Sequence, residues 1–155
     1  IAACRLSPDL NAVVFDLPRV LPIAQEIIAQ ASLADRIATQ AGDFTSDSLG
    51  SGFDVVLLSK VLHQECPDVC LSILRRAHDA LNGGGLVIIH GELLDDERRG
   101  PELAAVFGVQ ALLSCQHGGV YTQGQFKTWL AEAGFVEPQA KWLPGQMSIV
   151  TAHKP

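Results

Sequence analysis

The sequence has few basic residues, and this shortage limits the partners it can bind. Eleven Lys and Arg face seventeen Asp and Glu, for a net charge of −6. Binding to a nucleic-acid backbone depends on clustered positive charge that displaces counterions, so we expect no nucleic-acid partner. The chain also lacks the apolar run of about 18 residues that a membrane span requires, so we expect no membrane association. A small molecule is the expected partner.

The four cysteines include no Cys-X-X-Cys pair and no spacing of a disulfide framework. There is no signal peptide or lipidation motif, and we expect reduced thiols in a cytoplasmic protein. His63, Cys66 and Cys70 are close enough in sequence to be considered as metal ligands. However, Pro67 indicates that a helix begins between them, and zinc sites usually show paired ligands. We therefore expect no metal site.

The 155 residues, 48% of them hydrophobic, fit one domain with a sizeable core. Short β-rich segments alternate with segments of helical apolar spacing. Strands are predicted at 12–16, 36–44, 53–59, 86–90, about 135–142 and 147–153, and helices at 20–31, 67–81, 103–113 and 122–133. This alternation predicts an α/β protein with a doubly wound, mostly parallel sheet, whose ligands bind at the carboxyl ends of the strands.

Particular residues predict where these elements begin, end and are buried. The segment 53–59, "FDVVLLS", has no polar alternation in its apolar part, which is typical of a strand covered on both faces. Pro67 suits the first turn of the helix that follows, and Asn82-Gly83-Gly84-Gly85 is predicted to end it. Thr122 is the predicted N-cap of the last helix, which Gly134 closes.

Polar residues follow several predicted strands and are the candidates for a binding site. Asp16 ends an early strand, where a carboxylate is placed to accept hydrogen bonds from ribose hydroxyls. Asp43 can accept from an adenine amino group while the ring of Phe44 packs on the base. Two such acids disfavour a cofactor with an extra phosphate. The alternative is that both acids are turn formers at strand ends, and the spacing leaves both interpretations open.

Ser59, Lys60 and His63 follow the strand at 53–59. Histidine changes its charge near neutral pH and is therefore suited to act as a general base. The alternative for His63 is a loop histidine that is hydrogen-bonded to backbone.

Five stretches resemble the caffeic-acid-type small-molecule O-methyltransferases, a family of plant phenolic and bacterial polyketide and pigment enzymes. They are "VVFDLPRV", "AGDF", "FDVVLLSKVLHQECPD", "LNGGGLVIIHGELLDDE" and "YTQGQFKTWLAEAGF", in the order and spacing of that family. The similarity covers nearly the whole chain. It implies a Rossmann-like class I methyltransferase fold with an antiparallel strand near the C-terminus, and S-adenosylmethionine as the cofactor.

The resemblance also implies roles for individual residues. Asp16 and Leu17 match the ribose contacts, Asp43 and Phe44 the adenine site, and His63 the general base. Ser59 and Lys60 match positions near the sulfonium end of the cofactor. The family pocket for the acceptor implies Phe107, Leu112, Leu113 and Trp129 as candidate lining residues, although their helical spacing is equally typical of a core.

The same resemblance predicts that residues 1–155 are a partial catalytic domain. The family's first strand and glycine-rich loop are expected to precede Ile1, with the strand between 12–16 and 53–59 in the sheet. An N-terminal dimerisation domain is also expected to be absent from this chain, and the full-length protein is expected to be a homodimer.

The chain departs from the family at the acids that support the base. Gly91 and Val120 stand where the family has acids, and Glu92 comes one residue late. Because one residue along a strand reverses the face, Glu92 is expected to substitute only if a bulge intervenes. Glu65 or Asp68 are other candidates to assist. An S-adenosylmethionine-binding relative with other chemistry, such as hydroxylation or decarboxylation, and a non-catalytic pseudoenzyme therefore remain alternatives.

Overall fold

The computed structural model describes residues 1–155, the side chain of Gln146 excepted, and these residues form two compact units, Ile1–Leu49 and Gly50–Pro155. Each unit has its own sheet, one with two strands and one with four. No helix in the described part of the chain is both long and apolar enough to cross a membrane.

The first unit is a small α/β unit whose two parallel strands end on the same side of its sheet. It contains helices Ala2–Leu6 (α1) and Leu21–Gln30 (α2) and strands Ala12–Asp16 (β1) and Ile37–Ala41 (β2). The strands pair in parallel, with Asp16 opposite Ala41. The buried core is formed by Cys4, Ile28, Leu33 and Ile37. Because the two strands are parallel and in register, Asp16 and the residues after Ala41 lie at the same sheet edge.

The second unit carries the larger sheet, in the order β3-β4-β6-β5. Its strands are Phe53–Ser59 (β3), Leu81–Gly91 (β4), Val136–Trp142 (β5) and Ser148–His153 (β6). Strand β3 pairs in parallel with β4, whereas β6 is antiparallel to both β4 and β5. The predicted antiparallel strand near the C-terminus is therefore confirmed.

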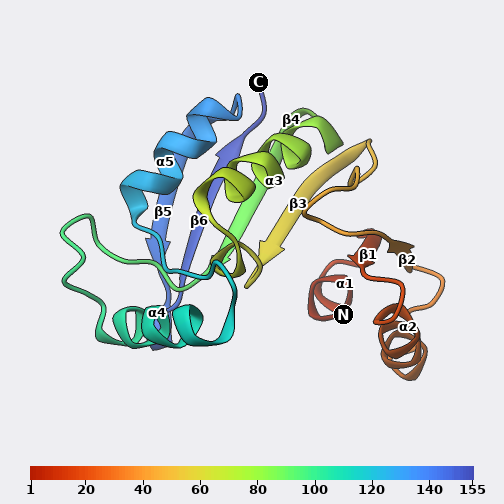
Figure 1. Ribbon diagram of the computed structural model, residues 1–155. Coiled ribbons are helices and arrows are strands. Elements are labelled where there is room, and N and C mark those ends of the chain that lie inside the picture. The colour runs from red at the N-terminus through yellow and green to blue at the C-terminus, as the bar shows by residue number, and fades with distance from the viewer. The chain divides into compact units, whose positions relative to one another are not determined.

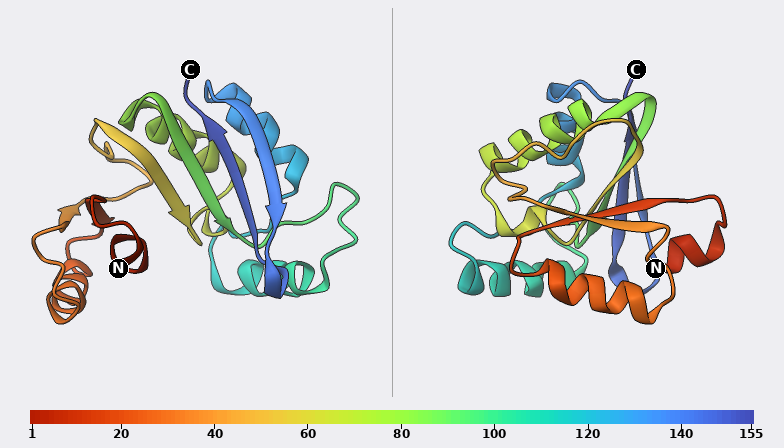
Figure 2. Two further views of the ribbon diagram at one scale, coloured as in Figure 1. Left: turned by 180° about the vertical axis from the view of Figure 1, so that it is seen from behind. Right: turned by 90° about the vertical axis from the view of Figure 1, so that its right-hand side faces the viewer.

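The helices of the second unit are Pro67–Ala80 (α3), Glu102–Ser114 (α4) and Gln123–Glu132 (α5), with short 3-10 turns at Leu62–Gln64 (η1) and Pro144–Gln146 (η2). Helices α3 and α5 cover one face of the sheet, and α4 lies beyond the end toward which β3 and β4 run (Figures 1 and 2). The core under α3 and α5 contains fully buried side chains of Ile73, Leu74, Val87, Leu130 and Val150. The polar residues at the carboxyl ends of β3 and β4 therefore lie on the side of the sheet where α4 is found.

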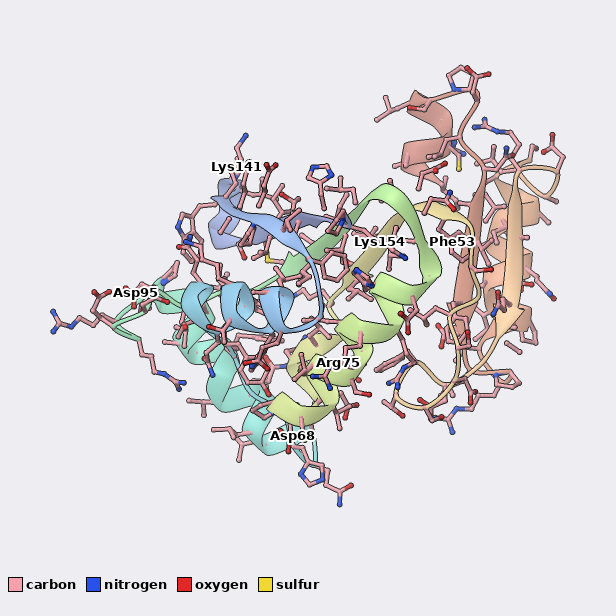
Figure 3. The ribbon with its side chains drawn as sticks, turned by 90° about the horizontal axis from the view of Figure 1, so that it is seen from above. Phe53, Asp68, Arg75, Asp95, Lys141 and Lys154 are labelled. Atoms are coloured by element: carbon pink, nitrogen blue, oxygen red, sulfur yellow. The ribbon has the colours of Figure 1, made fainter. Side chains whose placement is uncertain are left out.

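The helix boundaries follow the predicted signals closely. Helix α3 begins at Pro67. Thr122 caps α5, since its hydroxyl accepts from Gln125 N at 3.2 Å while the Gln125 side chain accepts from Thr122 N at 3.0 Å. At the other end of α3, Lys154 Nζ donates to the carbonyls of His78 and Leu81 (Figure 3). A cation there compensates the negative end of the helix dipole.

Two details of the predicted elements are wrong. The first is the end of α3, which lies at Ala80, so that residues 82–85 belong to β4. The pairing with β3 shifts from Phe53–Leu81 to Val55–Leu86. Residues 82–85 are therefore the extra residues of a bulge, in which Gly84 has φ +78°. The second is the burial of β3. Val55 and Leu57 are 46% and 61% exposed, because α3 and α5 cover only the opposite face of this sheet.

Candidate active site

The acids of the first unit lie at the common carboxyl edge of β1 and β2. Asp16 ends β1, and its Oδ1 accepts from Leu17 N at 2.7 Å. Gly42 N donates to Asp16 O at 3.0 Å, which places Asp43 immediately beyond this edge. Asp43 Oδ1 accepts from Thr45 N at 2.8 Å and from Thr45 Oγ1 at 2.6 Å. Both carboxylates thus lie at one edge, and each also orders its own turn.

Gly42 passes close to an aromatic ring of the same unit. A Cβ at this position would lie 2.2 Å from Cζ of Phe15, so a larger residue would have to displace the ring. Phe44, two residues later, is half-buried. The side chains at this edge are carboxylates, which accept hydrogen bonds and therefore suit the hydroxyl and amino groups of a nucleoside.

In the second unit, the residues predicted near the base are brought together at the end of β3 and β4. Ser59 lies opposite His90 in the parallel ladder, and Ser59 Oγ is 3.0 Å from His90 Nδ1. Lys60 N donates to His90 O at 2.9 Å, and Lys60 then leaves the strand with φ +59°. The left-handed conformation turns the chain sharply out of the sheet. The turn η1, which carries His63, begins two residues later.

The turn that carries His63 is anchored through its backbone carbonyls. Gly119 N donates to His63 O at 2.9 Å, and Cys70 Sγ donates to Leu62 O at 3.2 Å. The Tyr121 hydroxyl donates to Glu65 O. Burial raises the pKa of the Cys70 thiol to about 12 and also raises the pKa of Tyr121, so both stay protonated donors. Two separate segments, residues 119–121 and the first turn of α3, therefore hold the turn.

The side chain of His63 is half-buried beside an aromatic ring and two charges. Its ring meets Phe107 edge to face, with centroids 4.9 Å apart. Desolvation lowers the pKa of His63 below its ordinary value, the charge of Glu92 raises it, and the charge of Lys60 lowers it. Because the net direction is downward, the imidazole is neutral at pH 7. A neutral imidazole is the form that can accept a proton.

Glu92 is buried next to His63, although it comes one residue after the family position. Its side chain is 5% exposed and pairs with Lys60 Nζ. Strand β4 ends at Gly91, so the alternation of faces no longer constrains Glu92. Glu92 lines the same cavity as His63 without a bulge at this point, because the strand has already ended. No hydrogen-bond partner for Glu92 Oε2 exists among the residues that the structure describes.

Lys60 is placed between the acid and the aromatic ring. Its Nζ lies 4.6 Å from the centroid of Phe107, within the range of a cation–π contact. A small cavity of about 20 Å³, enough for roughly one water molecule, is lined by Lys60, His63 and Glu92 together with residues of β4, β6 and the segment before α5. Among the residues predicted to line the acceptor pocket, Phe107 contacts His63.

The other predicted lining and assisting residues lie elsewhere. Trp129 is buried against Tyr121 and Phe126, at centroid distances of 4.8 and 5.5 Å, and is a core residue. Leu112 and Leu113 are 70% and 85% exposed on α4. Asp68 is exposed at the start of α3 (Figure 3). The acid whose charge acts on His63 is Glu92.

The positions of the two replaced family acids are filled differently. Val120 is buried in a cluster with Leu94 and Ala104. Gly91 has its carbonyl bonded by Ser148 Oγ at 2.8 Å, and a Cβ there would meet nothing within 4 Å. Within the described residues, no group of three or more His, Cys, Asp or Glu is arranged to hold a metal ion. Cys70 points into the carbonyls of the turn.

Residues 1–136 match the sequence profile of a family described as an O-methyltransferase domain. The chain belongs to this family. It is 42% identical to 3-hydroxy-5-methyl-1-naphthoate 3-O-methyltransferase of Streptomyces sahachiroi, over 99% of this chain and 45% of the relative. It is 31% identical to the bovine (Bos taurus) acetylserotonin O-methyltransferase, over 99% of this chain and 44% of the relative. The chain therefore spans slightly less than half the length of these relatives.

Solved structures of this O-methyltransferase domain family match the whole chain. An O-methyltransferase family 2 protein from Planctomyces limnophilus, in complex with apigenin, has a TM-score of 0.92 and 27% identity, covering 99% of this chain and 46% of that one. Human N-acetylserotonin methyltransferase in complex with S-adenosylmethionine has a TM-score of 0.85 and 30% identity, covering 97% and 42%. The predicted Rossmann-like class I methyltransferase fold is confirmed.

Proposed function

We propose that this chain is part of the catalytic domain of an S-adenosylmethionine-dependent O-methyltransferase. Its acceptor is proposed to be a hydroxyl group on a small aromatic molecule. The observation that carries the proposal is the position of His63, a half-buried imidazole that follows the carboxyl end of β3 in a sheet where β3 and β4 are parallel. Family membership and the names of the relatives support the same reaction. The full-length protein is predicted to be a cytoplasmic homodimer.

The residues at the two sheet edges fit the proposed cofactor. Asp16 and Leu17 would hold the ribose, and Asp43 and Phe44 the adenine, because carboxylates accept from hydroxyl and amino groups and an aromatic ring packs on a base. Ser59 and Lys60 would lie near the sulfonium end. When bound, S-adenosylmethionine supplies an electrophilic methyl group next to a positive charge.

His63 is proposed to take the proton of the acceptor hydroxyl as that oxygen is methylated. A histidine of the ordinary pKa of about 6.5 facing a phenol of about 10 leaves roughly 5 kcal/mol for full deprotonation. The lowered pKa of His63 adds to this cost. Proton transfer in the transition state reduces this cost, because the oxygen loses its proton only as the new bond forms. The edge-to-face contact with Phe107 restricts the rotation of the imidazole ring.

The test measures methyl transfer and cofactor binding separately, in the full-length protein. We expect His63→Gln to lower the methylation rate roughly 100-fold or more, the usual contribution of a general base, with the affinity for S-adenosylmethionine nearly unchanged. The exposed His117 provides the matched control, His117→Gln. Equal rates in His63→Gln and the unchanged protein would refute the role of His63. Folded protein without affinity for S-adenosylmethionine would refute the cofactor.

A second experiment addresses the extent of the domain. We propose that residues 1–155 are a partial catalytic domain and that an upstream strand pairs with the strands of this chain. Calorimetry measures the affinity for S-adenosylmethionine of residues 1–155 and of a chain extended upstream. Binding by the extended chain alone is the expected result, and equal binding by both would contradict the proposed need for the upstream strand.

One observation favours a second candidate function. Val120 lies in an apolar cluster, and Gly91 has no side chain, so neither position can supply an acid to the base. A relative that binds S-adenosylmethionine and carries out other chemistry, such as hydroxylation or decarboxylation, or a non-catalytic subunit, would need no such acid. Product analysis by mass spectrometry distinguishes these candidates from O-methylation, which adds one methyl group to the acceptor.

A further inference from the structure

Lys60 is the accessible member of an ion pair beside the cavity of the second unit. Its side chain is 41% exposed, whereas the side chain of its partner, Glu92, is 5% exposed. Among the residues that line the cavity, Lys60 is the only lysine or arginine. A ligand that approaches the cavity from the accessible side of this pair therefore meets an ammonium group rather than a carboxylate.

Both the backbone and the side chain of Lys60 are held in place. Lys60 N donates to His90 O at 2.9 Å, which keeps the residue at the end of the β3–β4 ladder. Its φ of +59° is uncommon for a residue with a Cβ, and such conformations cluster at functional sites. The bond from Nζ to Glu92 restrains a side chain that is otherwise flexible. A ligand that binds this ammonium group therefore loses little further side-chain entropy.

Lys60 and His63 share one neighbour, the ring of Phe107. Lys60 Nζ is 4.6 Å from the centroid of this ring, and the centroid of the His63 ring is 4.9 Å from it. Both residues also line the same cavity. A planar acceptor whose hydroxyl group faces His63 therefore places a second substituent of its ring close to Lys60.

We propose that Lys60 is a specificity-determining residue that binds an anionic substituent of the acceptor, so that the acceptor is a hydroxylated aromatic acid. The inference rests on the proposed function and names the class of its acceptor. An ionised carboxylate only accepts hydrogen bonds, and an ammonium group has three donors, of which the bond to Glu92 uses one. Because hydrogen bonds between charged groups are stronger than neutral ones, the acid binds more tightly than an uncharged analogue of the same shape.

The charge of Glu92 would repel an anionic ligand if it were unpaired. Its carboxylate is buried, however, and is bonded to the ammonium group of Lys60. A carboxylate on the accessible side of this ammonium group is separated from Glu92 by a positive charge that attracts both. The charge of Glu92 is therefore compatible with an acidic acceptor.

The test compares aromatic acids with carboxamides of the same shape. The acceptors are hydroxybenzoates and hydroxynaphthoates, each paired with its carboxamide, and the enzyme is the full-length protein with S-adenosylmethionine. We expect the unchanged protein to prefer the acid of a pair roughly 10- to 100-fold in kcat/KM, the usual effect of a hydrogen bond to a charged group.

Variants of Lys60 show whether this residue is the cause of the preference. Lys60→Gln removes the charge but keeps a donor for Glu92, and we expect it to lower kcat/KM for the acid roughly 10- to 100-fold more than for the carboxamide. Lys60→Arg keeps the charge and is expected to retain part of the preference. Lys127→Gln, at an exposed lysine of α5, is the matched control. A merely structural role of Lys60 would lower kcat/KM equally for both members of a pair.

Calorimetry with the same pairs measures acceptor affinity without methyl transfer and separates this inference from the proposed function. A preference for the acid that disappears in folded Lys60→Gln supports the inference. Equal affinity and equal kcat/KM for acid and carboxamide in the unchanged protein overturn it, even if Lys60→Gln does not fold, and so does a preference that Lys60→Gln keeps. Failure of the proposed function is seen instead as the absence of methyl transfer to every acceptor, acid or carboxamide.

Discussion

The polar residues of the first unit and those of the second unit are held by different kinds of contact. In residues 1–49, the Asp16 carboxylate accepts a hydrogen bond from the next residue in the chain, and the Asp43 carboxylate accepts one from Thr45, two residues later. In residues 50–155, the turn with His63 is bonded from Gly119 and Tyr121, which lie more than fifty residues further along the chain. Local contacts order the two carboxylate side chains of the proposed nucleoside-binding edge, whereas residues 119–121, together with Cys70, hold the turn of the proposed base.

This difference has a physical consequence for what each unit tolerates. A turn stabilised by its own side chain keeps its conformation when neighbouring segments shift. A turn held from distant segments moves with them, so changes far from His63 are expected to affect the base. The comparison predicts that variants of the first unit alter cofactor affinity, whereas variants around His63 alter the rate of the chemical step.

A matched pair of glycine variants gives the largest expected contrast. A Cβ at Gly118 would lie 2.5 Å from the backbone oxygen of Ala111, whereas a Cβ at Gly42 would meet only the ring of Phe15. We expect Gly118→Ala to lower the free energy of unfolding by about 3 kcal/mol and Gly42→Ala by about 1 kcal/mol, because backbone yields less readily than a side chain. Chemical denaturation measures both values.

The same pair distinguishes the two units by function. Gly118 precedes the residue that bonds His63 O, so Gly118→Ala is expected to lower kcat, and Gly42→Ala to weaken S-adenosylmethionine binding. Equal effects of the two variants on kcat would contradict the comparison.

Asp16→Asn tests the first unit directly. Replacing the carboxylate by an amide keeps the size but weakens hydrogen bonds from ribose hydroxyls, which are worth about 1.5–3 kcal/mol to a charged acceptor. We expect the affinity for S-adenosylmethionine, measured by calorimetry, to fall roughly 10- to 100-fold. Asp35→Asn, at an exposed acid of the same unit, is the control. An unchanged affinity would favour the alternative that Asp16 only forms a turn.

Tyr121→Phe tests a distant contact of the second unit. The variant keeps the ring that packs on Trp129 and removes the hydroxyl that donates to Glu65 O. We expect a loss of about 1 kcal/mol in the free energy of unfolding, at the lower end for an unsatisfied carbonyl, since Cys70 Sγ lies 3.6 Å from the same oxygen. The rate is expected to fall with cofactor affinity unchanged. Lys154→Met, which destabilises the end of α3 far from the turn, is expected to leave the rate unchanged.

The smallest expected effect concerns pH. The pKa of His63 is lowered in the folded protein, so the unfolded chain takes up a proton first as the pH falls. The stability contributed by the neutral imidazole is present above pH 6.5 and is lost as the pH falls through the lower folded-state pKa. Unfolding curves between pH 5 and 8 are expected to show a smaller loss at acid pH for His63→Gln. Identical curves would contradict a lowered pKa.

Prediction from the sequence was most successful where the signal is local. Pro67, Thr122 and the apolar spacing of residues 20–31 predicted helices that the structure contains. The prediction failed for residues 82–85, because glycines suit a helix end and a bulge equally well. It also failed for the burial of β3, because an unbroken apolar run does not reveal which faces are covered.

The surroundings of His63 show the same limit. The sequence indicated His63 itself, and it listed Glu65, Asp68 and Glu92 as acids to support it, without a reason to prefer one. The choice of Glu92 depends on β4 ending at Gly91, and on Lys60 leaving β3 with a positive φ. Nothing in the sequence indicated that Tyr121 and Gly119 hold the turn of His63. The glycine pair before Val120 predicted only a loop.

The sequence by itself determined the order of strands and helices, the two acids that follow β1 and β2, and membership in the O-methyltransferase domain family, because these depend on residue type and on spacing along the chain. Only the tertiary structure decided which acid lies beside His63, which aromatic ring contacts it, and which carbonyls of its turn are bonded. Several of those contacts join distant residues, such as Lys60 with Glu92, 32 residues apart, and Tyr121 with Glu65, 56 residues apart. Their formation depends on where each strand ends, which residue spacing does not specify.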